Sequence, residues 1–212
     1  MSNAFRRFSL GSVLALIAGV AQAATPAAID ASAPAALIQT SSQTLLSDLD
    51  AHRAAYRKDV TLLYKVVDEV FLPHFDVDFA AQQVLGKHWR NASPEQRKRF
   101  VTAFYRSLLQ TYGDALVEFT SDRMKVLPFQ GDAAAPRASV RTEIRRSNGA
   151  TVAVNYSLRK TTSAEWKVWD VVIEGISYVK SFREDFGVEV DQQGLDSLIK
   201  RIESNAAAKD AH

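Results

Sequence analysis

Asp170 is the residue whose chemistry stands out first, because it is an acid inside an otherwise apolar segment. The segment, Trp166–Ile173, consists mainly of aromatic and β-branched residues. An acid that faces into a pocket from a curved sheet could act as a general base in an isomerase or a dehydratase. We favour a structural role, in which Asp170 faces away from Trp169 and pairs with an arginine or with a helix N-terminus.

Other signals for catalysis or metal binding are weaker. No spacing typical of metal ligands connects the four histidines, His52, His74, His88 and His212. Gly175-Ile176-Ser177 does not have the pattern of a nucleophile elbow. The chain has no cysteine, which excludes disulfides, thiolate metal ligands and a lipoprotein anchor. We therefore expect no metal, no cofactor and no enzymatic activity.

Arginine and lysine gather in two places that could bind an anion. One is a helix face that contains Arg97, Lys98, Arg99 and Arg106. The other, near a predicted hairpin, contains Arg141, Arg145 and Arg146. Each group is either an ordinary solvated surface or a contact site for phosphate head groups or an acidic partner.

The N-terminus has the pattern of a secretory signal peptide, predicted for residues 1–23. Two arginines precede an apolar run, Leu10–Val20, which is too short to span a bilayer, and a small-x-small cleavage signal follows it. Removing this segment leaves 24 of the 26 Lys and Arg residues against 24 Asp and Glu. The neutral remainder argues against nucleic-acid binding driven by bulk charge. We expect a periplasmic protein.

Hydrophobic periodicity predicts one α+β domain, residues 35–204, after a flexible leader at 24–34. Helices are predicted at 35–58, 60–71, 76–85 and 94–119, the last with a capping box between Ser93 and Gln96. A four-stranded antiparallel meander follows, with strands at 123–129, 138–146, 151–160 and 166–173. Two helices, at 178–191 and 195–204, close the domain. Residues 205–212 are predicted to be a disordered tail.

The last strand of the meander is predicted to be buried on both faces. One face carries Trp169, Val171 and Ile173. The opposite face carries Trp166, Val168 and Val172, interrupted by Asp170. In a small domain we expect helices to cover only one of these faces. The other face then needs more protein or an apolar ligand.

Five short motifs occur in order along the chain. They are Leu72-Pro73-His74-Phe75, Ala80–Gly86 with Trp89, Ser93-Pro94-Glu95-Gln96-Arg97 with Tyr112-Gly113, Asp170-Val171 with Glu174-Gly175-Ile176-Ser177, and Gly194-Leu195-Asp196-Ser197-Leu198-Ile199. Together they resemble the MlaC family of periplasmic phospholipid-binding proteins, also called toluene-tolerance proteins. The resemblance covers about Leu37 to Ile202.

The resemblance implies a highly curved sheet that helices close into a deep apolar pocket. Phospholipid acyl chains would occupy the pocket, with the head group outside. The implied partners are an outer-membrane lipoprotein–porin complex and an inner-membrane ABC transporter with a lipid-binding periplasmic ring. The implied function is to shuttle phospholipid between them, which maintains outer-membrane lipid asymmetry. We expect the chain to be a monomer.

Our candidates for residues that contact the lipid are large and apolar. They are Phe75, Val84, Trp89, Phe104, Leu108, Tyr112, Val152, Val154, Tyr156, Trp169, Val171 and Ile173. Each of them taken alone also fits an ordinary core position. Two other functions stay open. An inward Asp170 with access to water would favour an exported enzyme, and a core without a cavity would favour an interaction module without a ligand.

Overall fold

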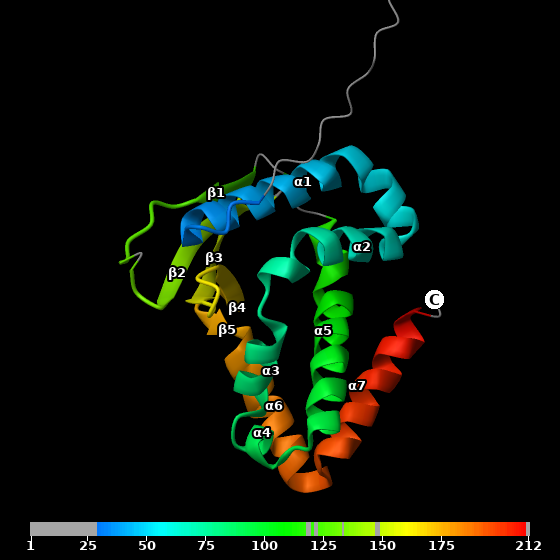
Figure 1. Ribbon diagram of the computed structural model, residues 1–212. Helices are drawn as coiled ribbons and strands as arrows, with labels where there is room; N and C mark the ends of the chain where they lie inside the picture. The colour runs from blue at the N-terminus through cyan, green and yellow to red at the C-terminus, as the bar shows by residue number, and fades with distance from the viewer. Residues whose placement is uncertain (1–28, 118–119, 121–122, 133, 147–148, 211–212) are drawn as a thin grey trace, which may run out of the picture.

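The computed structural model describes residues 29–117, 120, 123–132, 134–146 and 149–210. The predicted signal peptide and the first part of the predicted leader lie outside these residues. The helices are α1 (Pro34–Lys58), α2 (Val60–Val70), η1 (Leu72–His74), α3 (Val77–Leu85), α4 (Lys87–Asn91), α5 (Pro94–Leu116), α6 (Tyr178–Gln193) and α7 (Leu195–Asp210). The strands are β1 (Met124–Val126), β2 (Arg137–Arg145), β3 (Thr151–Lys160), β4 (Trp166–Ile173) and β5 (Ile176–Ser177). Helices, then strands, then helices confirm the α+β prediction (Figure 1).

The five strands form one antiparallel sheet in the order β1-β2-β3-β4-β5, so the predicted meander is confirmed with one short strand added. The added strand, β5, follows a two-residue turn at Glu174 and Gly175, where both residues have positive φ. Such a turn matches the twist of the strands it joins. Residues 147 and 148 of the predicted β2–β3 turn lie outside the described part of the chain.

A β-bulge in β4 changes which side chains share a face of the sheet. On β3, Ser157 is paired with Asp170, but the next residue, Leu158, is paired with Val168. Trp169 is therefore an extra residue on β4 with no partner of its own on β3. Because paired residues share a face, the alternation of side chains along β4 is interrupted at this position.

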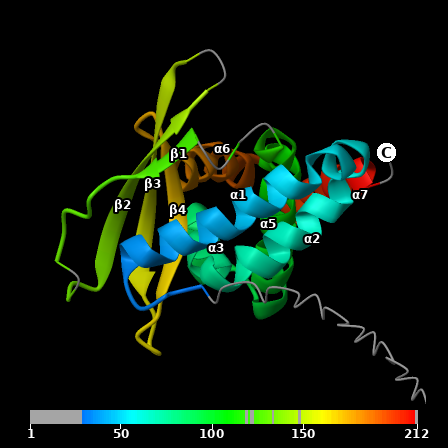
Figure 2. The same ribbon diagram turned by 90° about the horizontal axis from the view of Figure 1, so that it is seen from above.

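The bulge overturns the predicted grouping of Trp169 with Val171 and Ile173. Val171 packs in the same cluster as Trp166, on the side of the sheet that α1 covers. Trp169 instead meets the ring of Phe79 edge-on, with 5.4 Å between ring centroids, on the side that α3 and α6 cover. Helices thus cover both faces of β4 (Figure 2), so the second face does not need a ligand to cover it.

The hydrophobic core is divided into three clusters. The α3–α7 cluster is built by α3, the first half of α5, α6 and α7, and includes Phe100, Phe104 and Leu198. The α1–α2 cluster is built by α1, α2 and the end of α5, and includes Leu49 and Leu63. The sheet cluster packs the start of α1 on β2, β3 and β4, and includes Leu37, Ile38, Val140, Leu158, Trp166 and Val168.

Bridging residues between the three clusters are few. Phe75 packs on both the α3–α7 cluster and the sheet cluster. Met124 packs on both the α1–α2 cluster and the sheet cluster. Among the described residues, none belongs to both the α3–α7 cluster and the α1–α2 cluster. A domain of this size usually has one contiguous core. The boundary between the α3–α7 cluster and the α1–α2 cluster, which we call the seam, is therefore unusual.

Hydrogen bonds confirm the predicted start of α5. The Ser93 amide donates to Gln96 Oε1 at 2.9 Å, and the Gln96 amide donates to Ser93 Oγ at 3.1 Å, which is a complete capping box. At the start of α3, Asp76 Oδ1 accepts the Phe79 amide at 3.1 Å. Gly86 ends α3 at a φ of +52°. The short α4 after it was not predicted.

The two ends of the described chain differ from the sequence prediction. Ile29 and Ala31, in the predicted flexible leader, pack on the sheet cluster, and the Ala31 carbonyl accepts the Trp166 amide at 3.3 Å. Helix α7 continues through Asn205 to Asp210, where we predicted a disordered tail. None of the described helices has the length and hydropathy that a membrane span requires.

Candidate functional site

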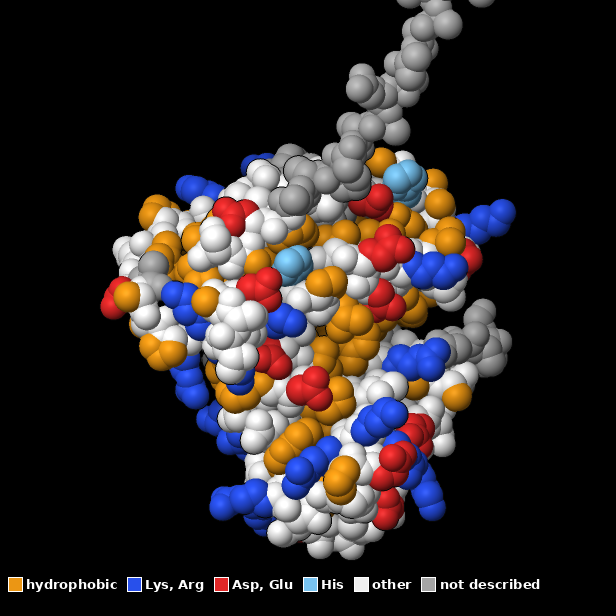
Figure 3. Space-filling model, viewed as in Figure 1, with side chains coloured by type: hydrophobic (Ala, Val, Ile, Leu, Met, Phe, Trp, Pro, Cys, Tyr) orange, Lys and Arg blue, Asp and Glu red, His pale blue; other side chains and the backbone are white. Residues whose placement is uncertain are grey.

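A cavity of about 670 Å³ lies in the seam between the α3–α7 cluster and the α1–α2 cluster. Its walls come from α2, η1, α3 and α5, through Thr61, Tyr64, Asp68, Leu72, Val77, Asp78, Val101, Thr102, Tyr105, Arg106, Leu109 and Gln110. In the space-filling view, hydrophobic side chains gather in the hollow in the middle of this face (Figure 3). The volume lies within the range of ~300–1,000 Å³ typical of small-molecule sites.

Helix α5 forms the continuous wall of the cavity. Val101 on this helix packs on the α3–α7 cluster, and Leu109 packs on the α1–α2 cluster. Eight helical residues span roughly 12 Å, so one helix crosses the whole seam. The opposite wall is interrupted, because α2 ends at Val70 and the chain turns through η1, which contains Pro73. Leu72 lines the cavity at this turn.

Gly113 allows α2 to approach α5 closely beside the cavity. A Cβ atom at Gly113 would lie 2.6 Å from Cε1 and 3.3 Å from Cδ1 of Tyr64, a residue that lines the cavity. Real Cβ atoms essentially never come so close to another heavy atom. Only glycine therefore fits at this position while the Tyr64 ring keeps its place.

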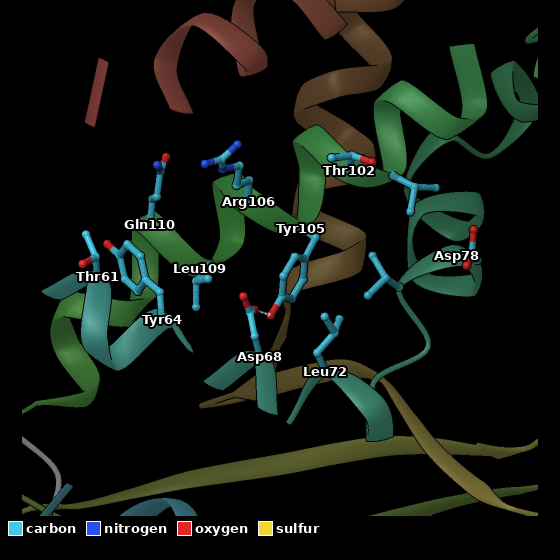
Figure 4. Close-up of a pocket in the computed structure, with 12 residues that line it drawn as sticks. Thr61, Tyr64, Asp68, Leu72, Asp78, Thr102, Tyr105, Arg106, Leu109 and Gln110 are labelled. Carbon is cyan, nitrogen blue, oxygen red and sulfur yellow. Dashed lines mark hydrogen bonds between the residues drawn. The ribbon is translucent and has the colours of Figure 1, made fainter. Parts of the chain in front are cut away.

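A hydrogen bond joins the two walls of the cavity. Figure 4 shows Asp68 of α2 and Tyr105 of α5 pointing toward each other, and the Tyr105 hydroxyl donates to Asp68 Oδ1. Burial, assisted by this hydrogen bond, raises the pKa of Tyr105 above its ordinary value. Tyr105 therefore stays protonated at neutral pH, and its hydroxyl continues to donate the hydrogen bond to Asp68.

The lining of the cavity contains more acidic than basic residues. Arg106 carries the only positive charge among the described residues that line the cavity, and its side chain is exposed. Asp68 and Asp78 are the two acids in this lining. Gln110, only 3% exposed, donates from Nε2 to the Ala206 carbonyl at 2.8 Å and so ties α7 to the wall.

The twelve residues predicted from the sequence to contact lipid do not line this cavity. Six of them pack in or against the α3–α7 cluster: Phe75, Val84, Trp89, Phe104, Leu108 and Trp169. Another five lie on the face of the sheet that α1 covers, which we call the inner face. Strand pairing there places Val154 beside Ile173 and Tyr156 beside Val171, with Val152 at the end of the same row. Tyr112 meets Tyr178 edge-on at 4.8 Å between ring centroids.

The sequence contained only a partial signal for the lining that the structure shows. Val77, Val101 and Leu109 lie in predicted helices and look like ordinary core positions, and Leu72 lies in the Leu72-Pro73-His74-Phe75 motif. Thr61, Asp68, Thr102 and Arg106 look like solvated helix surface. A cavity formed where three helices separate combines both kinds of residue, and hydrophobic periodicity alone does not distinguish it.

Asp170 has the structural role that we favoured, with one difference in orientation. The residue is 4% exposed, and its Oδ1 accepts the Val179 amide at 3.0 Å while its Oδ2 accepts the Ser177 hydroxyl at 2.6 Å. Both donors lie at the N-terminus of α6, where a negative charge is stabilising. The bulge places Asp170 on the same side of β4 as Trp169, where we predicted opposite sides. Asp170 does not line the cavity.

Two members of the predicted basic helix face are engaged within the protein. Arg97 donates to the Trp89 carbonyl at 3.0 Å, and its guanidinium lies 5.3 Å from the centre of the Trp89 ring. Arg99 forms two hydrogen bonds with the Glu203 carboxylate, at 3.1 and 2.7 Å. Lys98 is exposed on the same helix, and Arg106 lies at the cavity rim.

Metal ligands do not gather in the described part of the chain. No group of three or more histidine, aspartate and glutamate side chains there could hold a metal ion. His88 lies beside Asp191, with 3.5 Å between His88 Nε2 and Asp191 Oδ1. Burial lowers the pKa of His74 below its ordinary value.

Comparison with known proteins gives a consistent result. The family model described as MlaC protein matches residues 39–204. The toluene tolerance protein ttg2D of Pseudomonas putida is 34% identical over 169 residues, which cover 79% of this chain and 78% of that protein. The intermembrane phospholipid transport system binding protein MlaC of Haemophilus influenzae is 28% identical over 185 residues, 86% of each chain.

A solved structure also has the same fold. It is a phospholipid-binding protein from Ralstonia solanacearum in complex with a phospholipid, with a TM-score of 0.75 and 23% identity. The match covers 82% of this chain and 96% of that chain. At this identity the likeness supports the α+β architecture alone. On the matches of the family model and of the two relatives, this chain belongs to the MlaC family.

Proposed function

We propose that this protein is a periplasmic phospholipid carrier that holds acyl chains in the cavity between α2 and α5. The observation that carries the proposal is the seam in the core, where a cavity of about 670 Å³ separates two independently packed clusters. Membership of the MlaC family supports it, because the Haemophilus influenzae relative is described as a phospholipid transport binding protein.

The energetics explain why such a carrier needs an apolar cavity and no covalent chemistry. Burying one CH₂ group is worth ~0.8 kcal/mol, so an acyl chain of roughly 16 carbons gains on the order of 13 kcal/mol when it leaves water. A bilayer offers the chain a similar environment. Transfer between a membrane and the cavity is then nearly balanced, and the cost of exposing the chain to water is avoided.

Arg106 is our candidate for the head-group contact. It is exposed at the rim and carries the positive charge of the lining, and a guanidinium can form two parallel hydrogen bonds with a phosphate. Arg97 and Arg99 form hydrogen bonds within the protein, and head-group contact at these two residues stays a prediction. Replacing Arg106 with glutamine should weaken the binding of anionic lipids and leave acyl-chain burial intact.

The wider role follows the family. We propose that the signal peptide directs the chain to the periplasm, and that the carrier moves phospholipid between an outer-membrane lipoprotein–porin complex and an inner-membrane ABC transporter. Lipid contact at the twelve residues predicted from the sequence stays a prediction. Among them, Val152, Tyr156, Val171 and Ile173 remain half-buried on the inner face of the sheet, where a long acyl chain could reach them.

Native mass spectrometry of the exported protein, purified without detergent, tests the proposal. We expect a mass increment that organic extraction resolves into phospholipid. An apo mass, together with no uptake from labelled vesicles, would contradict carriage. In that case Asp170 and its neighbours would be assayed for enzymatic activity.

A pair of substitutions tests whether this cavity is the one that holds lipid. Leu72 lines the cavity, while Leu62 on α2 is 38% exposed and lies outside it. Leu72→Trp should reduce the fraction of protein that carries lipid, and Leu62→Trp should leave this fraction unchanged. Equal lipid content in the two variants would mean that acyl chains lie elsewhere, for example against the inner face of the sheet.

A further inference from the structure

The outer face of the sheet, which is the face opposite α1, carries a row of exposed basic residues along β2. The side chains on this face of β2 are all exposed, and they are Arg137, Ser139, Arg141, Glu143 and Arg145. The helices that contact this side of the sheet, α3 and α6, do so at β4. The outer face of β2 is therefore open in the described structure, and Arg137, Arg141 and Arg145 form what we call the basic strip.

The pairing of the strands extends the positive charge across the sheet. Arg137 on β2 is paired with Arg159 on β3, and Arg159 is paired with Lys167 on β4. Like charges that are directly opposite on neighbouring strands destabilise a sheet. Asp76 offsets part of this repulsion, since its Oδ2 lies 3.2 Å from Arg159 Nε. No ion pair within the described residues offsets the charge of Arg137.

Charge is unequally distributed along the chain, although its total is nearly neutral. Residues 124–160, which form β1, β2 and β3, contain seven Lys and Arg but only two Asp and Glu. The rest of the chain after the predicted signal peptide contains 17 Lys and Arg and 22 Asp and Glu. The protein is therefore strongly dipolar, and its positive end is the three-stranded part of the sheet.

We propose that the basic strip adsorbs to the surface of an anionic bilayer. In protein–protein interfaces, arginine hot spots cluster with aromatic anchors in desolvated pockets, and the outward side chains of β2 include no aromatic or large aliphatic residue. The arginines stand four residues apart, roughly 13 Å along a strand. Fluid anionic head groups can gather beneath each of such separated charges, whereas a protein surface would need matching acids at fixed positions.

This proposal does not depend on lipid carriage, because surface adsorption and cavity loading are separate measurements. The exported protein would be sedimented with vesicles of phosphatidylcholine alone and with added phosphatidylglycerol. At ~0.01 M salt the Debye length is ~30 Å, and at ~0.15 M it is about 8 Å. We expect sedimentation only with the anionic vesicles, strongest at low salt and weaker as salt is added.

Two triple variants locate the binding surface. One replaces the strip, with Arg137→Gln, Arg141→Gln and Arg145→Gln. The other is matched for charge and lies on α1, α2 and α7, with Lys58→Gln, Lys65→Gln and Lys200→Gln, all at exposed positions. We expect the strip variant to bind anionic vesicles on the order of a hundredfold more weakly at low salt. The control variant should bind like the natural protein, and both should keep its thermal stability and cargo.

Three results would overturn the proposal. The first is the absence of binding by the natural protein to anionic vesicles at low salt. The second is an equal loss of binding in the two triple variants, which would indicate a bulk charge effect. The third is strip-dependent binding to polyglutamate with no preference for anionic vesicles, which would indicate an acidic protein as the partner.

Discussion

Replacing Gly113 with alanine tests the closest packing at the cavity. The new Cβ atom would lie 2.6 Å from Cε1 of Tyr64, so the ring has to move by several tenths of an ångström or more. In a helix interior, Gly→Ala alone stabilises by roughly 0.5–1 kcal/mol. Overpacking a close contact costs about 1–3 kcal/mol. The two effects oppose each other, and a single variant does not separate them.

Gly187 on α6 provides the matched control. It is also a helical glycine, and a Cβ atom added there meets nothing within 4 Å. Gly187→Ala should therefore show the helix-propensity gain alone. The difference in the free energy of unfolding between the Gly113 and Gly187 variants isolates the contact with Tyr64, and we expect about 1–3 kcal/mol. In a chain of this size, that corresponds to a few degrees in Tm for each kcal/mol.

Urea unfolding followed by tryptophan fluorescence measures this difference, and native mass spectrometry measures the cargo. The Gly113 variant should carry less lipid, because the displaced Tyr64 ring lines the cavity. Tyr64→Ala combined with Gly113→Ala should remove the overpacking cost, as expected for two residues in direct contact. Equal stabilisation by alanine at Gly113 and at Gly187 would refute the close packing of α2 on α5.

Two further predictions concern charged groups away from the cavity. Asp170→Asn should lower the free energy of unfolding by about 2–4 kcal/mol, because the N-terminus of α6 loses a buried carboxylate partner. Unchanged stability together with the loss of an enzymatic activity would instead favour the enzyme alternative. The hydrogen bond from Arg99 lowers the pKa of Glu203 below its ordinary value of 4.5. The stabilisation from this pair is therefore fully present above pH 4.5, and it is lost as the pH falls through the lowered pKa of Glu203. The Arg99→Gln variant should consequently lose less stability on acidification than the natural protein. Thermal unfolding at several pH values measures this difference. The same loss in both proteins would contradict this pairing.

Local patterns predicted the secondary structure well. The capping box at Ser93 and Gln96 depends on residues within one helical turn, and it is found as predicted. Alternation over Thr151–Lys160 predicted the bounds of β3. These features are encoded by neighbours in sequence, so they can be recognised without knowledge of the tertiary structure.

The bulge at Trp169 shows what periodicity cannot predict. A strand pattern assigns faces by strict alternation, but the register between Ser157 and Asp170 depends on a partner strand. Placing Trp169 on the side of α3 lets its ring pack against Phe79, and this contact joins residues 90 positions apart. One extra residue was enough to exchange the faces predicted for half of the strand.

The cavity was missed for a different reason. Its lining combines apolar residues such as Leu109 with polar residues such as Asp68, and these lie on helices that separate only in the folded chain. Sequence reasoning placed the pocket under Trp169, because it assumed that helices could cover only one face of β4. In the structure α1 covers one face, and α3 and α6 cover the other.

The division of the core has a mechanical consequence. Helix α5 contributes to both clusters that flank the cavity, whereas α3 contributes only to the α3–α7 cluster and α2 only to the α1–α2 cluster. Because α2 and α3 share no core cluster, a change in the distance between them would leave the interior of each cluster packed as it is. The hydrogen bond from the Tyr105 hydroxyl to Asp68 Oδ1 joins α5 to α2 across the cavity. For the carrier that we propose, this division means that the separation of α2 from α3, and not the packing of a single core, sets the length of acyl chain that fits.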